Sequence, residues 1–167
     1  MEIDPDEGWL DEARRVPSPN CDARPAGADI TLMVVHGISL PPGEYGGGWI
    51  DDLFCNRLDP QAHPYFREIS GLQVSSHLLI RRDGGIVQFV PFHKRAWHAG
   101  ASCYEGREKC NDFSIGIELE GADDRVYSQE QYTRLAQTTL EIMQSCPAIT
   151  PERIVGHADI APGRKTD

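Results

Sequence analysis

No stretch of this 167-residue sequence approaches the roughly 20 consecutive apolar residues that a membrane-spanning helix requires. The first seven residues, Met1 to Glu7, are mostly acidic, whereas a secretory signal peptide begins with basic residues and continues with apolar ones. These two absences predict a cytoplasmic protein that does not enter a membrane.

Positive charge is also scarce. The sequence has 16 Lys and Arg residues against 26 Asp and Glu residues, which gives a net charge of −10 at pH 7. This balance repels nucleic-acid phosphates and anionic lipid surfaces over long distances, so neither is expected as a partner. A local basic pair, Arg164 and Lys165, can still bind a small anionic ligand, because a pocket responds to the charges beside it.

Cysteines with the C-x-x-C spacing of redox and zinc motifs are missing. The cysteines form an odd set, and in a reducing compartment their expected state is the free thiol. They are Cys21, Cys55, Cys103, Cys110 and Cys146.

The length fits a single domain, 1–167, since two domains of ordinary size need roughly 200 residues or more. Residues 1–29 are polar and carry prolines at positions 5, 17, 19 and 25. We therefore expect them to form an N-terminal arm that wraps the domain surface.

Short apolar runs interspersed with helical patterns predict an α+β fold, a mixed and mostly central β-sheet flanked by helices. Strands are expected at 30–35, 77–82, 86–90, 113–119 and 153–156, with 77–82 and 86–90 forming an antiparallel hairpin through Asp83-Gly84-Gly85. Helices are expected at 49–58 and 128–146, the second with Ser128 and Gln131 as a capping box. Its apolar spacing predicts a buried stripe of Tyr132, Leu135, Ala136, Thr139, Leu140 and Met143.

Two of the six histidines, His36 and His157, directly follow apolar strand-like runs, so both can project from neighbouring strand ends into one cleft. Asp167, ten positions after His157, can return to the same point. Two imidazoles and one carboxylate leave zinc a fourth position for water, which is typical of catalytic zinc sites. The alternative is that each histidine is an ordinary hydrogen-bonded structural residue, and spacing alone does not decide between the two.

The strand predicted around Glu118 has a period of two. One face carries Ile115, Ile117 and Leu119, and the other carries Gly116, Glu118 and Glu120. A carboxylate within an apolar strand is costly to bury without a partner, so Glu118 is expected to open onto a polar cleft. The alternative is a buried ion pair.

Other residues can extend such a site. Lys165, two positions before Asp167, can place an ammonium beside the metal, or it can be a solvated lysine. Trp97 and His98, followed by Gly100, combine an aromatic side chain with a glycine that allows close approach, which suits a sugar or a peptide. A core tryptophan is the alternative.

Taken together, these residues resemble the AmpD family of 1,6-anhydro-N-acetylmuramyl-L-alanine amidases, and the resemblance runs from Gly8 to Asp167. The segments that carry it, in order, are Val34-Val-His36 with Ile38-Ser-Leu-Pro-Pro-Gly43, His63-Pro-Tyr-Phe66, Ile80-Arg-Arg-Asp-Gly84, Ala96-Trp-His-Ala-Gly100, Asn111-Asp-Phe-Ser-Ile-Gly-Ile-Glu-Leu-Glu-Gly121, Gly156-His157 and Lys165-Thr-Asp167.

The resemblance implies that one zinc ion is bound by His36, His157 and Asp167, and that Glu118 and Lys165 are the catalytic pair. It implies the mixed-sheet fold shared with peptidoglycan recognition proteins and phage amidases. The implied reaction is hydrolysis of the amide between the lactyl group of 1,6-anhydro-N-acetylmuramic acid and L-alanine, in cell-wall recycling. The expected partner is this small-molecule anhydro-muropeptide, acted on by a monomer. Substrate contacts are expected from Tyr65, Trp97, His98, Lys109 and Arg164.

Three departures from the family pattern stand out. Gly37 takes the place of an Asn common after the first ligand, and Lys109 takes the place of an Arg, which gives up bidentate binding of a carboxylate. The family usually continues past Lys-Thr-Asp with Pro-Gly and another helix, a segment absent after residue 167 of this sequence. We therefore expect Asp167 to fray and zinc to be retained more weakly.

Two other functions stay open at this point. A non-catalytic muropeptide-binding module has the same fold, although such modules tend to lose metal ligands that are all present here. An autolysin that acts on intact cell wall uses similar chemistry, but it requires export.

Overall fold

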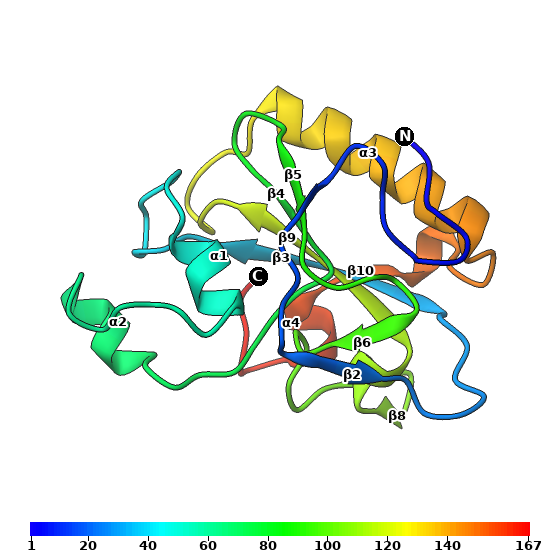
Figure 1. The fold of residues 1–167 in the computed structure, drawn as a ribbon. Coiled ribbons are helices and arrows are strands. Elements are labelled where there is room, and N and C mark those ends of the chain that lie inside the picture. Colours follow the sequence, from blue (N-terminus) through cyan, green and yellow to red (C-terminus); the bar gives the residue numbers. More distant parts are fainter.

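The computed structural model describes residues 1–167, and its centre is a six-stranded sheet (Figure 1). The strands lie in the order β1 (Arg14–Arg15), β5 (Ile86–Gln88), β4 (Leu78–Ile80), β9 (Ser114–Glu120), β3 (Leu32–Ile38) and β10 (Ile154–Gly156). β4 and β5 pair antiparallel, and the other neighbours pair parallel. The predicted mixed sheet and its hairpin are confirmed.

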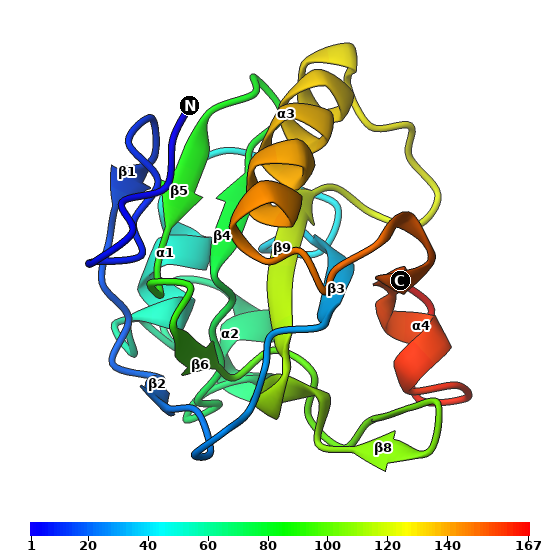
Figure 2. The same cartoon turned by 90° about the vertical axis from the view of Figure 1, so that its right-hand side faces the viewer.

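Residues 1–29 supply two short strands that attach this segment to the rest of the chain. β1 lies at the sheet edge beside β5, and β2 (Cys21–Ala23) pairs antiparallel with β6 (Lys94–Ala96) (Figure 2). The guanidinium of Arg24 then donates hydrogen bonds to the carbonyls of Phe92 and Ser114 at 3.1 and 2.9 Å. A separate two-stranded ribbon is formed by β7 (Cys103–Tyr104) and β8 (Arg107–Glu108).

Helices cover both faces of the sheet. α3 (Gln129–Ser145) crosses one face over β4 and β9, whereas α1 (Trp49–Phe54) and α2 (Pro64–Glu68) lie on the other (Figure 2). α4 (His157–Ile160) follows β10 directly, and the 3-10 helices are η1 (Cys110–Asp112) and η2 (Pro151–Arg153). None of these helices is long and apolar enough to cross a lipid bilayer.

The alternation of side chains along β4 divides the core into two layers. Leu78 and Ile80 pack in one cluster with Ile142 of α3, and Leu79 packs in another with Phe54 and Phe66 of α1 and α2. A strand that is apolar on both faces is what a sheet covered on both sides requires.

Several element boundaries differ from the sequence prediction: β4 and β5, for example, each end two residues earlier than expected. Two of the differences lie beside the cleft. β3 continues through Ile38, so His36 lies within the strand rather than just after it, because the segment stays paired with β9 up to Glu120. α1 ends at Phe54 instead of residue 58, since Asn56 adopts a left-handed conformation with φ of 57° that a helix cannot continue through.

The predicted buried stripe of α3 is partly wrong. Tyr132 and Leu140 are 50% and 61% exposed, and Ala136 is also exposed, whereas Gln131, Thr138 and Ile142 are buried. The reason is a polar contact: the Gln131 amide donates to the carbonyls of Ile80 and Glu120 at 3.1 and 2.9 Å, which turns that side of the helix toward the sheet. Leu135 and Met143 pack beside the core as predicted, and the capping box of Ser128 and Gln131 is confirmed.

The buried imidazole of His77 predicts acid sensitivity. Its Nδ1 accepts the Gly116 N–H at 3.0 Å, and burial, with Arg24 nearby, lowers its pKa to about 3. The unfolded chain takes up this proton near pH 6.5, so the folded state loses stability as the pH falls from there toward 3. His77→Gln removes this group, and we expect the loss of unfolding free energy between pH 7.5 and pH 5 to shrink by about 2 kcal/mol.

The measurement is urea unfolding of wild type and His77→Gln at pH 7.5 and pH 5. Comparing each protein with itself at the two pH values removes the part of the stability change that does not depend on pH. An unchanged pH dependence in His77→Gln would show that this imidazole does not titrate on unfolding as described.

Candidate metal centre

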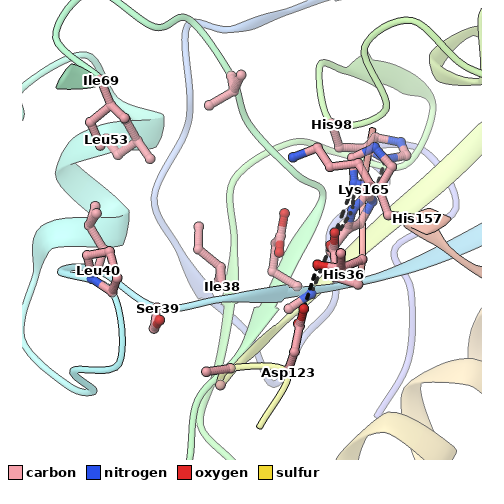
Figure 3. A pocket seen from close by; sticks show the side chains of 18 of the residues that line it. His36, Ile38, Ser39, Leu40, Leu53, Ile69, His98, Asp123, His157 and Lys165 are labelled. Carbon is pink, nitrogen blue, oxygen red and sulfur yellow. Dashed lines mark hydrogen bonds and ion pairs between the residues drawn. The ribbon is translucent and has the colours of Figure 1, made fainter. Parts of the chain in front are cut away.

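A cleft of about 660 Å³ opens beside the carboxyl-terminal halves of β3 and β9 (Figure 3). In sheets with parallel strands this edge is where ligands commonly bind, because side chains of several strands meet there. The polar side of the cleft carries His36, Glu118, His157, Lys165 and Asp167. These five residues are those that the sequence singled out for metal binding and catalysis.

The pairing of β3 with β10 brings the two histidines together. Gly156 is in register with Val35, so His157 follows at the level of His36, and their Nδ1 atoms lie 2.9 Å apart. The Oδ2 atom of Asp167 lies 3.6 Å from each of these nitrogens. Both imidazoles are buried, at 3% exposure.

These three atoms fit a zinc ion. Ligand atoms about 2.0–2.1 Å from a tetrahedral zinc ion lie about 3.3 Å from one another, close to the three separations observed here. A ligand set of two imidazoles and one carboxylate also suits zinc chemically and leaves one position for a further ligand.

Asp167 is held at its backbone and its side chain. Its carbonyl accepts the Ala158 N–H at 2.5 Å, and its Oδ2 accepts the Gly37 N–H at 3.3 Å. The structure therefore does not show the fraying that the sequence led us to expect. Burial favours the neutral acid, but the two imidazoles beside the carboxylate and the Gly37 N–H outweigh it and hold the pKa of Asp167 well below its usual range.

The surroundings of the His36 imidazole favour its neutral form, in which an imidazole can bind a metal ion. Burial lowers its pKa to about 4, although Asp167 beside it acts in the opposite direction. A neutral imidazole and an ionised carboxylate are the protonation states in which these groups bind a metal ion.

Glu118 lies on the adjacent strand, in register with His36. Burial, reinforced by the nearby charge of Asp167, raises the pKa of Glu118 to about 8. The buried ion pair that was the alternative for Glu118 is made instead by Glu120, two positions along, which lies 3.5 Å from Arg81. Glu118 has no ion-pair partner and lines the cleft.

The other predicted contact residues divide into two groups. Tyr65 lines the cleft from α2, and Figure 3 shows Lys165 next to the histidines. Lys109 and Arg164 instead line a second hollow of about 610 Å³, to which His36, His157 and Asp167 do not contribute. Trp97 lies outside the cleft, and its Nε1 donates to Asp22 at 3.3 Å.

His98 reaches the edge of the cleft, but both of its ring nitrogens are engaged. Nδ1 lies 2.8 Å from Nε2 of His36, and Nε2 lies 3.1 Å from the hydroxyl of Ser114. Its side chain therefore lies behind His36, with no free ring nitrogen for a substrate.

Sequence reasoning missed the apolar wall that faces the polar side of the cleft. It is built by residues from α1, α2 and the loops beside them: Leu40, Leu53, Ile69, Leu72 and Val74. The Pro-Pro and glycine pattern of 37–48 marks a loop, but only the fold shows that this loop and the one after α2 enclose one cavity.

Sequence reasoning also missed the carboxylate that holds the 39–48 loop. Glu120 accepts the Gly46 N–H at 2.7 Å and the Arg82 N–H at 3.2 Å, in addition to its ion pair with Arg81. A 2% exposed carboxylate that joins a loop to a strand end fixes one wall of the cleft.

Residues 26–167 match the sequence profile of the N-acetylmuramoyl-L-alanine amidase family. The chain is 63% identical over 163 residues to 1,6-anhydro-N-acetylmuramyl-L-alanine amidase AmpD of Salmonella typhimurium (strain SL1344), with 98% of this chain and 87% of the relative covered. It is 62% identical over 162 residues to the AmpD protein of Escherichia coli (strain K12), with 97% and 88% covered.

Solved structures agree. A crystal structure of a selenomethionine derivative of AmpD superposes with a TM-score of 0.96 at 61% identity, covering 100% of this chain and 92% of that one. The AmiD amidase of E. coli, solved with anhydro-N-acetylmuramic acid-L-Ala-D-gamma-Glu-L-Lys, superposes with a TM-score of 0.58 at 30% identity, covering 86% of this chain and 55% of that one.

The contacts of Glu120 predict the effect of removing its charge. Glu120→Gln removes the ion pair with Arg81, which keeps its 2.8 Å pair with Asp51, and weakens the hydrogen bonds from the Gly46 and Arg82 N–H groups, so we expect a loss of about 2 kcal/mol of unfolding free energy. Hydrogen–deuterium exchange of 43–48 should become faster. Glu44→Gln is the matched control, since Glu44 is exposed in the same loop and has no ion pair. Equal exchange in both variants would contradict the role given to Glu120.

Proposed function

Because this chain belongs to the N-acetylmuramoyl-L-alanine amidase family, we propose that it hydrolyses the amide between the lactyl group of 1,6-anhydro-N-acetylmuramic acid and L-alanine in muropeptides, using one zinc ion. The observation that carries the proposal is the convergence of His36, His157 and Asp167 on one point beside Glu118. The protein would act on small wall fragments as a cytoplasmic monomer with 1–167 as one amidase domain, in cell-wall recycling.

His36, His157 and Asp167 would hold the zinc ion. The chemistry that zinc supplies when bound is Lewis acidity, which lowers the pKa of water to about 7 and polarises a carbonyl group. The neutral imidazole of His36 and the ionised carboxylate of Asp167 support this assignment, because neither group has to release a proton near neutral pH to bind the metal.

Glu118 is proposed to carry the proton. Its carboxylate takes a proton from the attacking water and delivers it to the nitrogen of the leaving L-alanine. Its raised pKa, about 8, supports this role, since a group that titrates near the working pH can both accept and return a proton.

Lys165 is proposed to stabilise the oxygen of the lactyl carbonyl as it gains negative charge. One such donor contributes roughly 3 kcal/mol in other enzymes. Its place in the cleft beside the imidazoles supports the assignment, and its ammonium also favours the charged form of Glu118.

The substrate would lie between the polar residues and the apolar wall. Tyr65 is our proposal for a direct contact, because its side chain lines the cleft. Lys109 and Arg164 are proposed to bind carboxylates of the peptide where it extends into the second hollow. Trp97 and His98 are engaged by other side chains, so we assign them no substrate contact.

The decisive experiment is incubation of the zinc-loaded protein with anhydro-muramyl-tripeptide, followed by detection of free tripeptide. We expect Glu118→Gln to lower kcat by roughly 100- to 10,000-fold, because the proton carrier is lost. Binding of the tripeptide substrate should persist in this variant. Glu130→Gln, at an exposed position on α3, is the control and should turn over at the wild-type rate.

Two outcomes would redirect the proposal. Tight binding of the substrate without cleavage, in the zinc-loaded wild type, identifies a non-catalytic muropeptide-binding module. Equal rates on intact sacculi and on anhydro-muropeptides contradict a role in recycling and favour an autolysin.

A further inference from the structure

The segment 98–99 lies behind both histidines of the proposed zinc site, on the side away from the point where their Nδ1 atoms meet. The far nitrogen of His36, Nε2, lies 2.8 Å from Nδ1 of His98. The far nitrogen of His157, Nε2, lies 3.2 Å from the backbone carbonyl of Ala99. Two adjacent residues therefore contact both imidazoles.

The Ser114 hydroxyl, at the end of this chain of hydrogen bonds, sets the direction of the hydrogen bonds through His98. The Ser114 hydroxyl donates its one hydrogen to the carbonyl of Cys110 at 2.6 Å, so toward His98 it can only accept. The Nε2 of His98 must then carry the proton, which leaves its Nδ1 as an acceptor. The Nε2–H of His36 donates to that acceptor, and Nδ1 of His36 is left with a free lone pair.

The far nitrogen of His157 has two neighbours. The Ala99 carbonyl, 3.2 Å from Nε2, can accept a proton from it, whereas the Arg164 guanidinium, 3.4 Å away, can only donate. Because Nδ1 of His36 is an acceptor, the 2.9 Å contact between the two Nδ1 atoms is donated by His157 in the metal-free protein. A bound zinc ion would take the place of that proton, and the Ala99 carbonyl would then accept from Nε2 of His157.

The segment is itself fixed in place. The side-chain carbonyl of Asn111 accepts the backbone N–H groups of both His98 and Ala99, at 3.1 and 2.8 Å. Gly116 of β9 lies directly under the His98 ring, where a Cβ atom would come within 2.5 Å of it. Ser114 and Ala99 are fully buried, so water does not compete for these hydrogen bonds.

We propose that His98, with Ser114 behind it, is a positioning residue that sets the tautomer and orientation of His36. The inference rests on the proposed zinc site and assigns to His98 a task in metal retention in place of substrate contact. Partners behind a metal-binding imidazole typically change metal affinity by roughly 10- to 100-fold when they are removed.

The first test measures the zinc Kd by competition with a chromophoric chelator. We expect His98→Leu to weaken zinc binding by roughly 10- to 100-fold and Ser114→Ala by about 10-fold. His98→Asn should recover most of the loss, because its side-chain oxygen can accept from His36 where Nδ1 did. Ser76→Ala is the matched control: Ser76 is as buried as Ser114, but its hydroxyl bonds only the Leu78 carbonyl.

The second test reads the tautomers directly, by long-range ¹H–¹⁵N NMR of the histidine side chains in metal-free protein. Wild type should show His36 protonated on Nε2. In Ser114→Ala the His36 signals should move toward the other tautomer, while those of His77, which is held by the Gly116 N–H and the Lys94 carbonyl, stay unchanged. A general loss of packing would also disturb His77.

The inference is overturned if His98→Leu and Ser114→Ala bind zinc within twofold of wild type, or if the tautomer of His36 is the same with and without Ser114. Failure of the wild-type protein to bind zinc at all would overturn the proposed function instead. The NMR measurement, made without metal, would still decide whether this hydrogen-bonded chain sets the tautomer.

Discussion

The parallel pairing of β3 with β9 on one side and β10 on the other is the constraint on which the site depends. It sets His36 level with Glu118 and brings His157 beside His36, so three polar side chains from distant parts of the sequence meet at one sheet edge. Because strand side chains alternate between faces, a shift of one residue in either pairing would turn these groups into the core. Apolar residues of these strands that pack in the core beneath α3, such as Met33 and Ile117, oppose such a shift.

This arrangement buries many polar groups, and the structure compensates for them with hydrogen bonds. His77, His98 and Ser114 are deeply buried, and each is bonded to backbone or to another side chain. Unpaired polar groups in such places would cost several kcal/mol of folding free energy. The hydrogen bonds that orient the site therefore also offset the cost of burying its polar groups. Glu118 is the exception: it has no ion-pair partner, and it faces the cleft where a reaction would use it.

The sequence predicts the sheet and the three groups that converge because these features are local or nearly so. The sequence alone is enough to recognise a strand-like run followed by a histidine, or a period of two around Glu118. The roles of His98 and Glu120 cannot, because they depend on where the 97–112 segment and the 39–48 loop lie against β9. The buried stripe predicted for α3 is partly wrong for a related reason. Apolar spacing does not reveal that Gln131 donates hydrogen bonds to two carbonyls of the sheet.

The short pairing of β2 with β6 gives the N-terminal arm an influence beyond its own stability. Asp22 holds Arg95 through its carboxylate and accepts from the Trp97 indole, and the next two residues are those that touch His36 and His157. For protein engineering, this couples the two regions. A relative's arm grafted onto this domain would bring its own contacts to Arg95 and Trp97, so an exchange of residues around Asp22 is best made together with 95–99.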